Sequence, residues 1–196
     1  MKYMLIVLLF TCTCSGLNAQ VADLVSINEK RINTNKKAML VLGGWGAGNL
    51  ATGFLLMGQA DGSTKHFHQM NAGWGAINLG LATFSYLASA KTDPASFNTF
   101  QTFEEQHKIQ KILLFNAGLD LAYITGGLYL RERSNNPSGN PERLRGFGES
   151  IILQGSFLFV FDLAVFLLHR RQNQSLQVLL EGLSFHGNGL GWRMAF

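Results

Sequence analysis

Five polar side chains lie inside the longest apolar stretches of this chain, where such residues are rare. They are Asn49, Asn78, Asn116, Asp120 and Asp162. An ionised carboxylate at the centre of a bilayer costs about 3 kcal/mol even on a lenient insertion scale, so we expect Asp120 and Asp162 to face other helices. Ionisable groups at such depth often mark a proton, cation or ligand site. The alternative is a structural belt of hydrogen bonds that fixes the register of the helices.

Two of the asparagines belong to a motif that occurs twice. Gly44-Trp45-Gly46-Ala47-Gly48-Asn49-Leu50 returns 29 positions later as Gly73-Trp74-Gly75-Ala76-Ile77-Asn78-Leu79. Residues four apart share a helix face, so Trp45 lies beside Asn49, and Trp74 beside Asn78. These four side chains and Asn116 complete a candidate polar pocket around the two aspartates.

Small residues in the same motif predict close packing of helices. The residues concerned are Gly44, Ala47, Gly48, Gly73 and Ala76. Small side chains let two membrane helices approach closely. We expect these residues to pack helices inside the molecule, and a homodimer that uses the same spacing remains open.

Four apolar segments supply the helices that would position these residues: 37–58, 67–90, 107–130 and 145–169. Each is long enough to cross a bilayer. Only 14% of the residues are charged, whereas about a quarter is typical of soluble domains. The sequence therefore predicts an all-α membrane protein with an antiparallel four-helix transmembrane bundle over residues 37–171. A soluble bundle is the alternative, but its helices should carry a charged stripe.

The two ends of the chain differ in pattern from the apolar segments. Residues 1–20 have the layout of a secretory signal peptide, and an uncleaved anchor is the alternative. Residues 21–36 predict an interfacial amphipathic helix, with Leu24, Ile27 and Ile32 on one face. Apolar residues alternate in the tail, 172–196, before and after His186-Gly187-Asn188, which predicts a C-terminal β-hairpin ending in Met194 and Phe196.

No pattern typical of an enzyme or a cofactor protein occurs. The chain lacks a phosphate-binding loop, a zincin helix and a serine elbow. We expect no catalytic residue, no metal and no cofactor, and we interpret Glu149 and Gln154 as headgroup-level or packing residues. The basic residues stand at segment ends without interleaved aromatics, which favours membrane lipids over nucleic acid as partners.

The predicted export signal, the polar helix from Ile27 to Lys37, the Gly-Trp-Gly-Ala-x-Asn motif and the C-terminal strand make the chain similar to an uncharacterised family. That family comprises small, exported, four-span helical proteins of Gram-negative envelopes. The resemblance implies a cell-envelope location, with the inner membrane favoured and the outer membrane possible, and no activity. We expect a non-enzymatic interaction or assembly component whose partner is a second copy or another envelope protein. The alternative is a small carrier or sensor that binds a proton, cation or polar ligand at Asp120 and Asp162.

Overall fold

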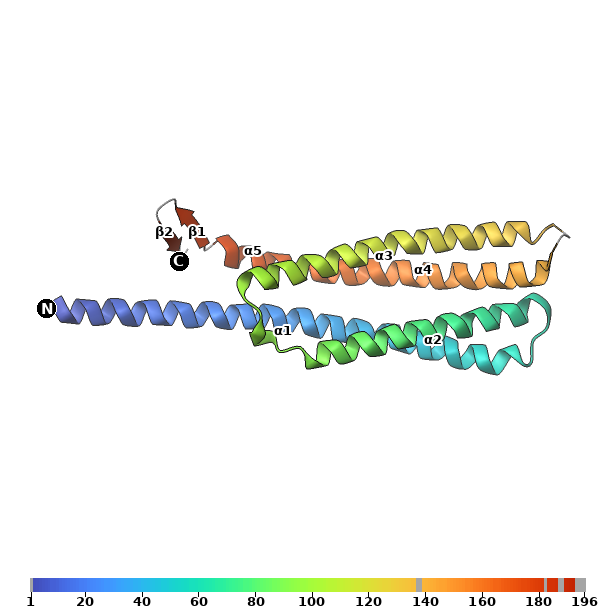
Figure 1. Cartoon of the computed structure of the whole chain (residues 1–196), viewed down its shortest axis with the longest axis horizontal. Helices are drawn as coiled ribbons and strands as arrows, with labels where there is room; N and C mark the ends of the chain where they lie inside the picture. Colours follow the sequence, from blue (N-terminus) through green and yellow to red (C-terminus); the bar gives the residue numbers. More distant parts are fainter. Residues whose placement is uncertain (1, 137–138, 182, 187–188, 193–196) are drawn as a thin grey trace.

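Four long helices form the body of the protein. The computed structural model describes residues 2–136, 139–181, 183–186 and 189–192. The long helices are α1 (Lys2–Met57), α2 (Gly62–Lys91), α3 (Thr99–Arg133) and α4 (Pro141–Arg171), and the short elements are η1 (Pro94–Ser96), α5 (Asn173–Glu181), β1 (Leu183–His186) and β2 (Gly189–Trp192). Figure 1 shows the long helices side by side as two hairpins, α1–α2 and α3–α4. The hairpins meet chiefly through α2 and α4.

Local sequence signals set the starts of α3 and α4. The side chain of Asn98 accepts a hydrogen bond from the backbone N–H of Gln101, whose side chain accepts from the N–H of Asn98 in return. This reciprocal capping satisfies backbone donors that the first helical turn leaves free. Asn140 caps α4 through the N–H of Arg143, and Pro141 occupies the first turn, where its missing N–H costs nothing.

Each hairpin closes on a pair of glycines. A Cβ added to Gly46 would lie 2.6 Å from the backbone nitrogen of Leu79, and one added to Gly75 would lie 2.7 Å from the carbonyl oxygen of Gly46. The two copies of the repeated motif therefore pack against each other through their central glycines. Gly127 and Gly148 do the same between α3 and α4, where either Cβ would lie 2.7 Å from the other residue's carbonyl oxygen.

The five small residues predicted to pack helices inside the bundle face outward instead. Gly44, Ala47, Gly48, Gly73 and Ala76 are all exposed. A Cβ added at any of the three glycines would meet no atom within 4 Å. The central glycines that make the contact are two residues away, which is about 200° around the helix. Thus the motif was correctly expected to pack closely, but the wrong face of it was assigned to the bundle.

The predicted fold class is wrong in the number of membrane-spanning helices. Three helical stretches of the described chain are long and apolar enough to cross a membrane: Leu24–Met57, Thr99–Arg133 and Pro141–Gln177. The predicted segment 67–90 is helical as part of α2, but α2 is not among the three. Glycine, serine, asparagine and tryptophan dilute its apolar content, and its polar residues Asn71, Asn78 and Ser89 are buried within the bundle.

Both ends of the chain also differ from the predicted fold class. Residues 21–36 belong to α1 and form no separate helix; Ile27 and Ile32 are buried, and this part of the molecule contacts η1 and α3. The bundle is built of helices alone, and the predicted tail, 172–196, begins with a helix, α5, which was not expected. The short strands β1 and β2 pair with each other, with Leu183 opposite Trp192, and with no other described strand. Met194 and Phe196 lie outside the described residues.

The outer surface is apolar where a soluble bundle would be charged. Phe84, Leu55 and Phe115 are 76%, 68% and 68% exposed. Inside, Ala38, Leu42, Ala82, Leu113, Phe161 and Val165 form a core cluster contributed by all four long helices. Extended apolar surface of this kind marks contact with a membrane or a partner. With three helices able to cross a bilayer, it indicates a membrane-associated protein.

Candidate functional site

A buried glutamine joins three helices near the middle of the bundle. Gln154 of α4 is fully buried; its Oε1 accepts from Trp45 Nε1 at 2.8 Å, and its Nε2 donates to Asn49 Oδ1 at 2.8 Å. The same Nε2 lies 3.0 Å from Asn71 Oδ1 of α2, which also accepts from Ser150 Oγ at 2.6 Å. We call these five residues the polar network. It provides paired hydrogen bonds for groups that would otherwise be buried without partners.

Each tryptophan of the repeat also contacts an aromatic ring of another helix. Trp45 stacks on Phe157 of α4, with ring centroids 3.9 Å apart and planes 8° from parallel. Trp74 lies edge-on to Tyr123 of α3, with centroids 5.1 Å apart. The two tryptophans of the repeat thus serve different helix pairs, and only Trp45 enters the polar network.

The two predicted aspartates meet inside the bundle. Asp120 of α3 and Asp162 of α4 are 3% and 6% exposed, and their carboxyl groups lie close enough to interact with each other. We call them the carboxyl pair. An ionised carboxylate can only accept hydrogen bonds, so a bond between two carboxyl groups requires one shared proton. Asp120 Oδ2 is buried without a partner, and neither carboxyl forms a salt bridge in the described chain.

Asn78 and Asn116 lie close to this level but join neither cluster. Asn78 is 2% exposed, and its Nδ2 has no hydrogen-bond partner. Asn78 lies one helical turn before Ala82. Ala82 and Phe161 belong to the same core cluster, and Phe161 directly precedes Asp162. Asn116 is half-buried, one turn before Asp120 on α3. The structure therefore brings Trp45 to Asn49 and Asp120 to Asp162, and leaves Trp74, Asn78 and Asn116 beside these pairs.

The centre of the polar network was not predicted from the sequence. Gln154 was interpreted as a headgroup-level or packing residue because it lies near the start of the predicted segment 145–169; α4 begins earlier, at Pro141. Ser150 and Gln154 of α4 are four residues apart, the same spacing as Trp45 and Asn49. That spacing, which puts two polar groups on one face, could have identified them.

A second polar cluster lies at the end of the bundle where α3 begins. Asn28 Nδ2 donates to Thr102 Oγ1 at 2.8 Å, and Arg31, 4% exposed, lies 3.9 Å from a carboxylate oxygen of Glu105. His169 is fully buried there, with both ring nitrogens unpartnered. Further hydrogen bonds join Asn35 to Ser89, Gln106 to the His169 carbonyl, Gln110 to Asn173 and Gln172 to Thr34. No group of three or more histidine, cysteine or acidic side chains suited to a metal ion occurs among the described residues.

Comparison with known proteins assigns this architecture to a family. Residues 41–163 match a family of unknown function, DUF6992. Because the match covers more than half of the chain, the protein belongs to that family. The matched region contains the carboxyl pair and the whole polar network, and it excludes Arg31 and His169. No curated protein and no solved structure matches the chain.

Proposed function

We propose that this protein is a non-enzymatic membrane protein that senses protons through the carboxyl pair, Asp120 and Asp162. The observation that carries the proposal is the pair of neighbouring buried carboxyl groups without a salt-bridge partner in the described chain. Two such groups can hydrogen-bond to each other only when they share a proton. The unpartnered Oδ2 of Asp120 gives a second proton or a small cation a place to bind. In this proposal the polar network is structural, and the carboxyl pair is the responsive element.

Loss of the shared proton would act directly on the contact between α3 and α4. Two carboxylates about 4 Å apart repel each other by about 4 kcal/mol at an effective dielectric constant of 20. The helices have little room to absorb this, because a Cβ added at Gly155 would already lie 3.0 Å from the carbonyl oxygen of Asp120. A switch needs an element with two arrangements that the proton can bias. The proposed element is the α3–α4 hairpin, closed with the proton bound and loosened without it.

The first test is the pH dependence of unfolding in mixed micelles. Stability contributed by a shared proton is present at low pH and is lost as the pair deprotonates with rising pH. We expect the wild-type protein to lose stability as the pH rises, whereas Asp120→Asn and Asp162→Asn should show a much smaller dependence. An amide cannot ionise and can still donate to the remaining carboxylate.

Asp61→Asn is the matched control, because Asp61 is exposed at the start of α2 and its side chain caps no N–H. It should keep the full wild-type pH dependence. Equal pH dependence in the wild-type protein and in both carboxyl-pair variants would contradict the proposed function.

A second candidate function, assembly with a partner helix, rests on the outward face of α1. Gly44 and Gly48 are four residues apart with Ala47 between them, all three are exposed, and nothing lies within 4 Å of a Cβ at either glycine. This spacing is typical of helix pairs in membranes. A second copy of the chain is the simplest partner. The envelope of a Gram-negative bacterium, with the inner membrane favoured, is the proposed location, supported by the predicted export signal and the three apolar helices.

The assembly candidate predicts that Gly44→Leu with Gly48→Leu abolishes self-association. The measurement is energy transfer between donor- and acceptor-labelled copies in lipid vesicles at increasing protein density. Gly118→Leu with Gly126→Leu is the control, because a Cβ added at either of these α3 glycines would also meet no atom within 4 Å. The control should associate like the wild-type protein. Energy transfer no higher than random collisions produce in the wild-type protein would rule out this face as a self-association surface. Equal loss of energy transfer in both variants would rule it out as well.

A further inference from the structure

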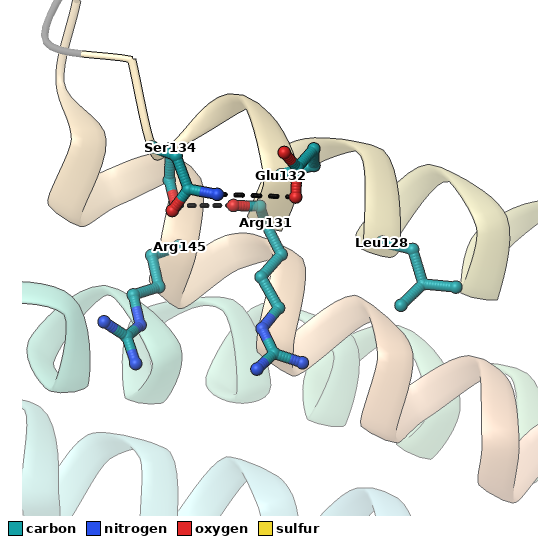
Figure 2. Close-up of a pocket in the computed structure, with 6 residues that line it drawn as sticks. Leu128, Arg131, Glu132, Ser134 and Arg145 are labelled. Atoms are coloured by element: carbon teal, nitrogen blue, oxygen red, sulfur yellow. Dashed lines mark hydrogen bonds between the residues drawn. The ribbon is translucent and has the colours of Figure 1, made fainter.

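A pocket opens at the turn where α3 ends and α4 begins. Its volume is about 310 Å³, and its lining residues are Leu128, Arg131, Glu132, Ser134, Asn135 and Arg145. Figure 2 shows Arg131 from α3 and Arg145 from α4 extending side by side, with both guanidinium groups toward the same side of the hairpin. Guanidinium groups carry several N–H donors in a fixed planar arrangement, which suits the oxygens of a phosphate.

The charges in the pocket leave part of both guanidinium groups available. Arg131 forms no salt bridge in the described chain. Arg145 donates from Nε to Glu149 Oε1 at 3.1 Å, and its side chain is 59% exposed. Glu132 is the one carboxylate in the lining, and its Oε2 lies 3.3 Å from Asn135 Nδ2. Because Glu132 accepts from Asn135 and Glu149 holds only the Nε of Arg145, the guanidinium of Arg131 and the outer nitrogens of Arg145 are left to bind an anion.

The neighbouring arginines are occupied differently. Arg133 donates to the hydroxyl of Tyr129 at 3.0 Å, and the guanidinium of Arg143 lies over the ring of Phe147, 5.0 Å from its centroid. Neither residue lines the pocket. Arg133 and Arg143 carry the same charge at the same end of the bundle. Substituting them therefore tests whether an effect belongs to the pocket or to basic residues in general.

The pocket lies at the boundary between apolar and basic chain. Two of the helical stretches able to cross a membrane, Thr99–Arg133 and Pro141–Gln177, meet at this turn. Leu128, one turn deeper than Arg131, is 51% exposed and gives the pocket an apolar wall. A ligand that fits both parts has a phosphate group joined to a hydrocarbon chain. Basic pockets at helix ends bind lipid headgroups in this manner.

We propose that Arg131 and Arg145 bind the phosphate of an anionic membrane phospholipid, whose acyl chain lies against Leu128. Arg145 contributes through its outer nitrogens while Glu149 holds its Nε. Ser134 and Asn135 line the same space and offer further polar groups to the headgroup. The site is independent of the carboxyl pair, so either proposal can fail without the other.

The test is native mass spectrometry of the full chain released from nanodiscs that contain phosphatidylglycerol and phosphatidylcholine in equal amounts. We expect the wild-type protein to retain phosphatidylglycerol preferentially. Arg131→Gln with Arg145→Gln should reduce this retention by roughly 10- to 30-fold, the effect of two basic groups at a membrane surface. Arg131→Lys with Arg145→Lys, which keeps the charge but loses the paired donor geometry, should fall in between.

Arg133→Gln with Arg143→Gln is the matched control and should retain phosphatidylglycerol at the wild-type level. Equal losses in this control and in the pocket variant would overturn the site in favour of diffuse attraction by basic residues. Equal retention of the two lipids by the wild-type protein would also overturn it. Millimolar inorganic phosphate is added in a separate arm; displacement of the lipid by phosphate at that concentration would identify a free phosphate site instead. Helical circular dichroism checks that each variant is folded.

Discussion

Alanine at both Gly46 and Gly75 is expected to destabilise the α1–α2 hairpin by roughly 2–4 kcal/mol. Added methyl groups in a close-packed contact cost about 1–3 kcal/mol each, and the helix propensity of alanine returns up to ~1 kcal/mol at each site. Here the overlap is with backbone, since a Cβ at Gly46 would lie 2.6 Å from the nitrogen of Leu79. Backbone cannot rotate aside as a flexible side chain can, so the helices must separate. The measurement is the unfolding midpoint in mixed micelles.

Gly44→Ala with Gly73→Ala provides the control within the same repeat. Both glycines are exposed and have nothing within 4 Å of an added Cβ. Alanine there should leave stability unchanged or raise it through helix propensity. If this control pair destabilised the protein as much as the Gly46 and Gly75 pair, the assignment of inner and outer faces of the repeat would be wrong.

Gln154→Leu is expected to cost roughly 2–4 kcal/mol, because it leaves two buried groups without partners. These are the indole N–H of Trp45 and the Oδ1 of Asn49, both of which bond to Gln154. Asn71 keeps its hydrogen bond from Ser150, so the loss should be largest between α1 and α4. The measurements are the unfolding midpoint and the fluorescence of Trp45, read in a variant that lacks Trp74 and Trp192.

Gln59→Leu is the comparison for this substitution, since Gln59 is exposed beyond the end of α1. We expect it to change stability by less than about 0.5 kcal/mol, as is usual for surface positions. Gln154→Glu should also destabilise the protein, because a carboxylate cannot donate to Asn49 or Asn71. Wild-type stability in Gln154→Leu would show that the polar network contributes nothing to the fold.

Apolar length predicted the positions of the four long helices, but it did not predict that the first of them extends unbroken toward the N-terminus as far as Lys2. The predicted segments 37–58, 67–90, 107–130 and 145–169 coincide with the apolar parts of α1 to α4. Periodicity could not predict which side of the Gly-Trp-Gly motif faces inward. Both faces of α1 carry small residues there, and the choice between Gly46 and Gly44 depends on contacts with α2 that are distant in sequence.

Only part of the candidate site was predicted from the sequence. Asp120 and Asp162 stood out because a carboxylate is costly inside an apolar helix, and that cost led to the expectation that they face other helices. Gln154 carries no charge and gave no such signal, yet it joins Trp45, Asn49 and Asn71. The spacing of Ser150 and Gln154 could place both on one face of α4, but their partners depend on the order and depth of the helices, which local spacing does not contain.

The most direct test of the central claim is infrared spectroscopy of the protein in lipid at about pH 6, where exposed aspartates and glutamates are ionised. The proton shared by Asp120 and Asp162 should give a protonated-carboxyl C=O band that shifts in deuterated water. We predict that this band is present in the wild-type protein, disappears as the pH rises, and is absent from the Asp120→Asn, Asp162→Asn double variant. A wild-type spectrum without the band, or a double variant that retains it, would contradict the shared proton and with it the proposed function.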